Sequence, residues 1–268
     1  MDKRPIGVFD SGLGGLTVVK SILGELPQEN IIYFGDTGRV PYGNRSKETL
    51  LHYVRQDMEL LVSRGVKAVV IACNTADSMA RREMTETFSL PIIGVVEPAG
   101  KKAAALTKNG RIGVIATAAT VASKAYENVI KEASPEAQVF AKACPLLVPL
   151  VEEGRVQRGD IVTETVLREY LEPLQNEGID TLILGCTHYP LLYDIISDIL
   201  PGVELICSGF ASTELLKETL QENGMLNTSG KHGEIEFYVS DSPEKFAANG
   251  GLFIGREIGA DVGKITFE

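Results

Sequence analysis

Short, unbroken apolar runs alternate along the chain with longer segments in which apolar residues recur at helical spacing. The first run, residues 6–9, passes through a glycine-rich turn into helical spacing at residues 16–23. Such runs are too short for buried helices and too continuously apolar for edge strands, so they are predicted to be strands buried on both faces of a parallel sheet. Further strands are predicted near residues 31–34, 69–72, 91–96, 112–118, 139–141, 182–185, 203–206 and 235–239.

Helices are predicted between these strands, near residues 46–63, 76–88, 123–132, 161–177, 189–200 and 211–222 and from residue 243, with a proline-punctuated connector at 144–154. Strands that alternate with helices in this way are typical of parallel sheets covered by helices on both faces. The pattern therefore predicts an α/β fold with doubly wound parallel sheets in three layers, helices on either side of strands.

Two of the predicted strands end in similar motifs. One run closes with Ala72-Cys73-Asn74-Thr75 and the other with Gly185-Cys186-Thr187-His188. Each motif places a thiol and hydrogen-bonding side chains at the carboxyl end of a strand, which is the edge where open α/β sheets bind ligands.

A second pair of strands repeats at nearly the same distance. Residues 112–118 align with residues 6–12 at an offset of 106 (112 − 6), and the two cysteine strands align at an offset of 113 (186 − 73). Two matches in the same order favour a duplicated α/β unit over chance similarity between apolar strands. The sequence therefore predicts one site between two pseudo-symmetric halves, with a cysteine on either side of it.

The matched thiols are suited to acid–base chemistry. A thiolate is the reactive form of cysteine, and a strand-to-helix turn favours the anion through the exposed amides and dipole of the helix. Two thiols on opposite sides of one carbon can take a proton from one face and return one to the other, which inversion of a stereocentre requires. Most free cysteines are buried and inert, and that interpretation is kept for Cys144 and Cys207, which lack a matched motif.

Polar side chains near both motifs complete the predicted site. Asp10, Glu152 and His188 could hold or shuttle protons for the thiols. The groups that could bind the ammonium and carboxylates of an amino acid are those of Ser11, Asn74, Thr75, Thr117, Thr120 and Thr187. Each of these could instead satisfy only strand ends and helix caps. The turn at residues 12–15 could hold an anion such as a carboxylate on its backbone amides.

Composition excludes several classes of protein. The chain has 268 residues, with 36 acidic against 26 basic side chains, and no basic stretch, so a nucleic-acid partner is disfavoured. No apolar run reaches membrane-spanning length, and the first residues lack the apolar core of a signal peptide. A cytoplasmic protein with reduced cysteines and no membrane association is expected.

The sequence also lacks the usual signatures of cofactors. Thr17 stands where a dinucleotide fingerprint would need its third glycine, and no G-K-[ST] sequence follows a glycine-rich loop. No C-x-x-C occurs, only three histidines are present, and no lysine stands out as a Schiff-base site. Neither a metal nor an organic cofactor is expected.

Five motifs, in order along the chain, resemble those of the glutamate racemases in the cofactor-independent aspartate/glutamate racemase family. They are Gly7–Thr17, Gly35–Thr37, Pro41–Gly43, Ala72–Ala76 and Gly185–Pro190. The resemblance runs from about residue 5 to residue 210 and is weaker beyond. It implies interconversion of L- and D-glutamate, which supplies D-glutamate for peptidoglycan synthesis.

The resemblance also implies roles for individual residues. Cys73 and Cys186 would be the two acid/base residues, with Cys73 working on the D-isomer and Cys186 on the L-isomer. The glutamate-binding pairs would be Asp10-Ser11, Tyr42-Gly43, Asn74-Thr75 and Thr187-His188. Members of the family have two domains and are often homodimers. The division implied here is residues 1–97 with 208–268, and residues 98–207, with the active site between them. The short N-terminus resembles members that need no cell-wall nucleotide activator.

Two departures from the family pattern are present. Asp77 follows the first cysteine motif where many relatives have a neutral residue, and Glu97-Pro98-Ala99-Gly100 replaces a more usual His/Glu-Pro-Gly. Two other functions stay open: a racemase for another acidic amino acid, aspartate in particular, and a two-lobed amino-acid-binding protein without catalysis.

Overall fold

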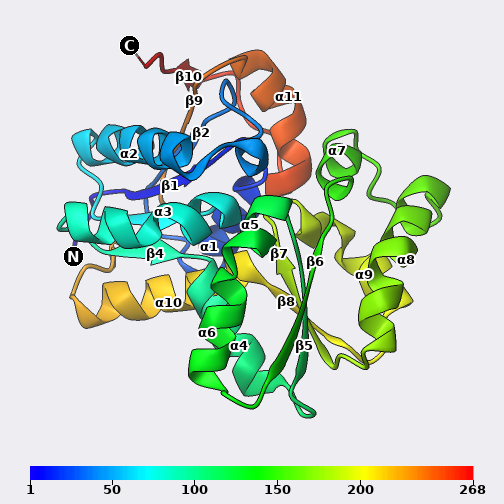
Figure 1. The fold of residues 1–268 in the computed structure, drawn as a ribbon. Coiled ribbons are helices and arrows are strands. Elements are labelled where there is room, and N and C mark those ends of the chain that lie inside the picture. The colour runs from blue at the N-terminus through cyan, green and yellow to red at the C-terminus, as the bar shows by residue number, and fades with distance from the viewer. Residues whose placement is uncertain (268) are drawn as a thin grey trace.

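The strands form two separate sheets in a computed structural model that describes residues 1–267 (Figure 1). Sheet A has the order β10-β9-β2-β1-β3-β4, and sheet B has the order β6-β5-β7-β8. The strands of sheet A are β1 (Ile6–Asp10), β2 (Ile31–Gly35), β3 (Ala68–Ile71), β4 (Ile92–Gly94), β9 (Ile235–Val239) and β10 (Val262–Lys264). Those of sheet B are β5 (Arg111–Ala116), β6 (Gln138–Ala143), β7 (Thr181–Gly185) and β8 (Glu204–Cys207). Every pairing is parallel, which confirms the predicted fold class.

Helices cover both faces of each sheet. They are α1 (Leu16–Glu25), α2 (Lys47–Ser63), α3 (Asn74–Thr87), α4 (Val96–Leu106), α5 (Ala118–Ser123), α6 (Ala125–Ala133), α7 (Leu147–Glu152), α8 (Ile161–Asn176), α9 (Tyr193–Ile199), α10 (Ser208–Glu222) and α11 (Pro243–Ile254). Short 3-10 helices occur at η1 (Tyr42–Asn44) and η2 (Tyr189–Leu192). One face of sheet A packs on α2 and α3, and the other packs on α1, α10 and α11. Neighbouring strand residues point to opposite faces, so the unbroken apolar runs of the sequence fill both cores.

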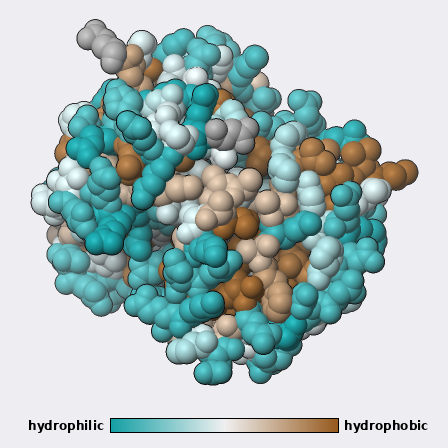
Figure 2. Space-filling model, in the orientation of Figure 1, coloured by the Kyte–Doolittle hydropathy of each residue, from teal (hydrophilic) through white to brown (hydrophobic). Residues whose placement is uncertain are grey.

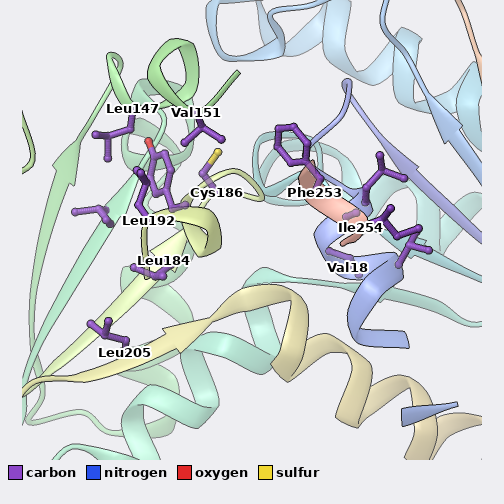
Figure 3. Packing of buried hydrophobic residues seen from close by; sticks show 14 of the residues in the cluster. Val18, Leu147, Val151, Leu184, Cys186, Leu192, Leu205, Phe253 and Ile254 are labelled. Carbon is purple, nitrogen blue, oxygen red and sulfur yellow. The ribbon is translucent and has the colours of Figure 1, made fainter. Parts of the chain in front are cut away.

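One hydrophobic cluster continues from sheet A to sheet B. It contains Ile6 and Val8 of β1, Leu182 and Leu184 of β7, and Phe253 from the end of α11. Figure 3 shows Phe253 and Ile254 of α11 on one side of this cluster and Cys186 and Leu192 on the other. The two sheets therefore share apolar packing.

The chain crosses between the sheets twice, once from β4 to α4 and once from β8 to α10. Sheet A is therefore built from both ends of the chain, and sheet B from its middle. The predicted domain boundaries, after residues 97 and 207, fall close to these crossings and stay a prediction.

Several element boundaries differ from the sequence prediction. The strand predicted at residues 91–96 ends at Gly94, and α4, which was not predicted, begins at Val96. The strand predicted at 112–118 ends at residue 116, because the Thr117 side chain accepts a hydrogen bond from the Thr120 amide and starts α5. The predicted connector at 144–154 contains the helix α7, and β10 was also missed. By contrast, Ser46 caps α2 through the Thr49 amide, as its position before the helix predicted.

The face drawn in Figure 2 is polar over most of its area, and apolar side chains gather in its middle, over α5 and β6. A second apolar group lies at the start of α8, where Ile161 and Val162 are exposed. Among the helices of residues 1–267, none combines the length and apolar character that crossing a bilayer would need.

Candidate active site

A cavity of about 410 Å³ lies where the carboxyl ends of strands from both sheets face each other. From sheet A it is lined by Ser11 after β1 and Cys73 after β3, and from sheet B by Thr117 after β5 and Cys186 after β7. Its size falls in the range of small-molecule sites. The structure thus brings both predicted cysteines to one cavity, one from each sheet.

Both thiols are nearly enclosed but reach the cavity. Cys73 is 7% exposed and Cys186 is 6% exposed, and neither is in a disulfide. Cys73 is the N-cap residue of α3, and Cys186 occupies the turn between β7 and η2. The matching positions follow from the matching motifs, because each strand ends at a small residue before its cysteine.

The Cys73 thiol makes one long hydrogen bond to a side chain. It donates a hydrogen bond to Ser11 Oγ at 3.6 Å. Burial, together with the nearby Asp10 carboxylate, raises the pKa of Cys73 to about 12. This thiol is therefore protonated at neutral pH, and an added positive charge nearby would favour its anion.

The Cys186 side holds a chain of ionisable groups. Cys186 Sγ lies 3.8 Å from His188 Nδ1, and His188 Nε2 lies 3.0 Å from Glu152 Oε1. Burial alone would lower the pKa of His188, but its hydrogen bonds to Cys186 and Glu152 outweigh burial and raise the pKa to about 10. The imidazole ring also meets the Phe253 ring edge-on at 5.3 Å, which fixes its orientation. The two thiols thus have unlike surroundings.

Asp10 lies behind the cavity rather than on its wall. Its side chain is fully buried, and burial raises the pKa of its carboxyl. It accepts a hydrogen bond from the Gly12 amide at 2.9 Å, and the Thr187 hydroxyl lies 3.4 Å from it. The glycine-rich turn was predicted to be able to hold an anion such as a carboxylate on its backbone amides, and its Gly12 amide holds the Asp10 carboxylate of the chain itself.

The glycine-rich turn at residues 12–15 also packs closely against the motif that contains Cys186. A Cβ at Gly14 would lie 2.6 Å from His188 Nδ1 and would overlap the Thr187 hydroxyl. Thr17, at the start of α1, donates to the Thr187 carbonyl at 3.0 Å. Only glycine at position 14 lets this turn pack directly on the second motif.

The predicted hydroxyl groups form a linked set on the cavity wall. Thr75 Oγ1 lies 2.9 Å from Thr117 Oγ1 and 3.3 Å from Thr120 Oγ1. Thr75 and Thr117 line the cavity, whereas Thr120 lies behind them and supports them. Asn74 also lines the cavity, and its Oδ1 accepts from the Tyr126 hydroxyl at 2.6 Å.

Tyr42 and Gly43 line the cavity too, but the Tyr42 hydroxyl points away into a buried acidic cluster. It lies 2.5 Å from Asp36 Oδ2 and 2.9 Å from Asp57 Oδ2, and Arg39 bridges both carboxylates at 2.6 Å. Burial and repulsion by Asp36 raise the pKa of Asp57 well above its usual value. Of this pair, only the Tyr42 ring and the backbone are left for a ligand.

Sequence reasoning missed this acidic cluster and several residues of the cavity wall, among them Cys144. Asp57 falls on the apolar face of α2 with Val54, Met58 and Leu61, and a carboxylate in that register was the signal. Cys144 lines the cavity although it was interpreted as inert, and burial raises the pKa of its thiol to about 12. Within residues 1–267, no group of three or more His, Cys, Asp or Glu side chains could hold a metal ion.

Comparison with known proteins extends over the whole chain. The Asp/Glu/Hydantoin racemase family model matches residues 37–216. The chain is 44% identical over 269 residues to a glutamate racemase of Geobacter metallireducens, covering 100% of this chain and 98% of that one. It is 47% identical over 255 residues to a glutamate racemase of Neisseria meningitidis serogroup C, covering 95% and 94%. The crystal structure of glutamate racemase from Francisella tularensis in complex with D-glutamate matches with a TM-score of 0.91 and 40% identity, covering 99% and 98%.

Proposed function

Because the chain belongs to the Asp/Glu/Hydantoin racemase family, we propose that it interconverts L- and D-glutamate, with Cys73 and Cys186 as the two acid/base residues. The family membership indicated by the five sequence motifs is confirmed, and the protein is an isomerase. The observation that carries the proposal is the pair of thiols that reach one cavity from two similar parallel sheets.

The reaction requires one thiolate and one thiol at a time. The thiolate takes the Cα proton from one face of the amino acid, and the opposite thiol gives its proton to the other face. The Cα–H bond breaks on one side, a new one forms on the other, and the two cysteines exchange protonation states. Because no proton is gained or lost overall, the same cavity serves both directions.

The surroundings of the thiols support this cycle. The pKa of Cys73 is about 12, so the positive ammonium group of a bound amino acid would help to form its thiolate. On the other side, His188 Nδ1 lies 3.8 Å from the Cys186 sulfur, and the pKa of His188 is raised to about 10, so a positive charge lies beside this thiol at neutral pH. Linked hydroxyls at Thr75 and Thr117 supply donors for a carboxylate, whose charge increases as the Cα proton leaves.

The family relationship supports three further parts of the proposal. The enzyme acts in the cytoplasm, supplies D-glutamate for peptidoglycan and works as a homodimer. Light scattering after size-exclusion chromatography tests the last of these, and a monomer at micromolar concentration would contradict it.

The proposal is tested by racemisation of pure L-glutamate and pure L-aspartate, followed by polarimetry, with protein dialysed against a chelator and no cofactor added. We expect glutamate to racemise and aspartate to racemise far more slowly. Preference for aspartate would favour the alternative racemase. A protein that binds glutamate yet exchanges no Cα proton in deuterated water would be a binding protein, and the proposal would be wrong.

A further inference from the structure

The first turn of α3 contacts both segments where the chain crosses between the sheets. This turn begins at Cys73, its N-cap residue. The side-chain Nδ2 of Asn74 lies 3.3 Å from Ser208 Oγ, at the crossing from β8 to α10. The Asp77 carboxylate holds the other crossing, from β4 to α4.

The contact of Asp77 with the first crossing is tight and buried. Its Oδ2 accepts hydrogen bonds from the Val95 amide at 2.9 Å and from the Val96 amide at 2.7 Å. A Cβ at Gly94 would lie 2.5 Å from the Asp77 carboxyl carbon, so the carboxylate fills the space that this glycine leaves. No residue at the start of α4 supplies a side-chain cap. Asp77 therefore supplies to α4 what a capping side chain would.

The helix that Asp77 caps packs on the opposite sheet. Val96, Ala99 and Ala103 of α4 belong to the hydrophobic cluster that contains Ile112 of β5 and Ile183 of β7. The Asp77 carboxylate, on α3 next to Cys73, therefore holds the N-terminal end of α4, and α4 packs on sheet B, which carries Cys186.

Ion pairs continue the link from α3 to α4. Arg81 Nε lies 3.4 Å from Asp77 Oδ1, and its terminal nitrogen lies 2.5 Å from Glu97 Oε2. Lys101 pairs with the other Glu97 oxygen at 2.6 Å. One arginine, Arg81, thus joins Asp77 on α3 to Glu97 on α4.

We propose that Asp77 is a positioning residue that fixes sheet B relative to α3 and thereby sets the separation of the Cys73 and Cys186 thiols. The inference rests on the proposed two-thiol function. Removing a proton needs only one thiol close to Cα, whereas inversion needs both thiols at reacting distance at once. A looser crossing should therefore reduce inversion more than proton removal.

The test compares Asp77→Asn with Asp180→Asn. Asp180 also accepts two backbone hydrogen bonds, from Lys108 at 2.6 Å and Asn109 at 2.7 Å, but it joins segments that all belong to the side of sheet B. In deuterated water, each variant is given pure D- or L-glutamate. Deuterium gained at Cα without inversion is measured by NMR, and inversion is measured by polarimetry.

We expect the ratio of exchange to inversion to rise about 10-fold or more in Asp77→Asn, since a misplacement of about 1 Å can cost about 100-fold in rate. Asp180→Asn should keep the wild-type ratio. Gly94→Ala, which displaces the same carboxylate from the other side, should shift the ratio in the direction of Asp77→Asn. A wild-type ratio in Asp77→Asn, or an equal rise in Asp180→Asn, would overturn the inference.

A second measurement does not depend on activity. Non-thiol spin labels at Arg82 on α3 and Ile161 on α8, both exposed, report the distance between the two sides. We expect a broader distance distribution in Asp77→Asn than in the wild type and Asp180→Asn, and an unchanged one would reject the inference. If the wild type failed to racemise glutamate, the proposed function would be wrong, and this distribution would still decide the position of the sheets.

Discussion

The buried carboxyl of Asp77 makes the stability of the fold depend on pH in a way that one substitution should remove. Burial raises the pKa of Asp77 from 3.8 to about 6, although Arg81 and the Val95 and Val96 amides oppose the rise. The native state therefore binds the Asp77 proton more tightly than the unfolded chain does. The resulting stabilisation is fully present below pH 3.8 and is lost as the pH rises through about 6.

The size of this effect follows from the two pKa values. Each unit of difference corresponds to about 1.36 kcal/mol, so the full effect of Asp77 is about 3 kcal/mol. Measurements between pH 5 and pH 8 avoid acid unfolding. By proton linkage, about 1.4 kcal/mol of the Asp77 stabilisation is lost over this range. Asp77→Asn cannot titrate, so this part of the pH dependence should vanish in the variant.

The assay is urea unfolding of the wild type and Asp77→Asn at pH 5 and pH 8. From pH 5 to pH 8, the unfolding free energy of the wild type should fall by about 1.4 kcal/mol more than that of the variant. Any constant cost of the weaker amide cap cancels in this comparison. In Asp180→Asn the curve should parallel the wild type, because hydrogen bonds from Thr107, Asn109 and Lys108 outweigh burial and lower the pKa of Asp180 below the window. Equal pH dependence in the wild type and Asp77→Asn would refute the reasoning.

Three further predictions concern the cavity. Cys73→Ser and Cys186→Ser should both lose racemisation, because a hydroxyl is a far weaker acid than a thiol. By NMR, Cys73→Ser should retain slow Cα exchange with L-glutamate, and Cys186→Ser should retain it with D-glutamate. The same preferred enantiomer in both variants would contradict the two-thiol assignment. Gly14→Ala should lower kcat about 100-fold by displacing the second motif, and polarimetry at saturating glutamate would expose an error if kcat stayed at the wild-type value. Glu152→Gln should lower the pKa of His188 from about 10, since one of the hydrogen bonds that raise it is weakened; an unchanged NMR titration of the ring would show that Glu152 has no such effect.

The features that depend on residues adjacent in the sequence could be predicted from it. Cys73 and Cys186 each follow directly on a buried strand, and the parallel fold then brings strand ends to one edge. The matching motifs thus located both thiols and most of the polar residues of the cavity wall.

The features that depend on distant residues could not be predicted. The start of α4 has no local cap, because the cap is Asp77, which lies on another helix. Tyr42 was expected to bind glutamate, and nothing near it in the sequence showed that its hydroxyl would meet Asp57 on α2. Asp10 was placed correctly at a strand end, but only the packed structure shows that the Gly12 amide turns it inward.

The composition of sheet A from both ends of the chain has a consequence for synthesis on the ribosome. Sheet B has all its strands once residue 207 has emerged, whereas β2 has no partner on one side until residues 235–239 are made. The part of the protein that begins first is therefore completed last, and until then the nascent chain carries an open strand edge that can pair with other chains. Truncation shortly before β9 would leave that edge permanently exposed, so aggregation, rather than simple loss of a C-terminal tail, is the expected fate of such a fragment.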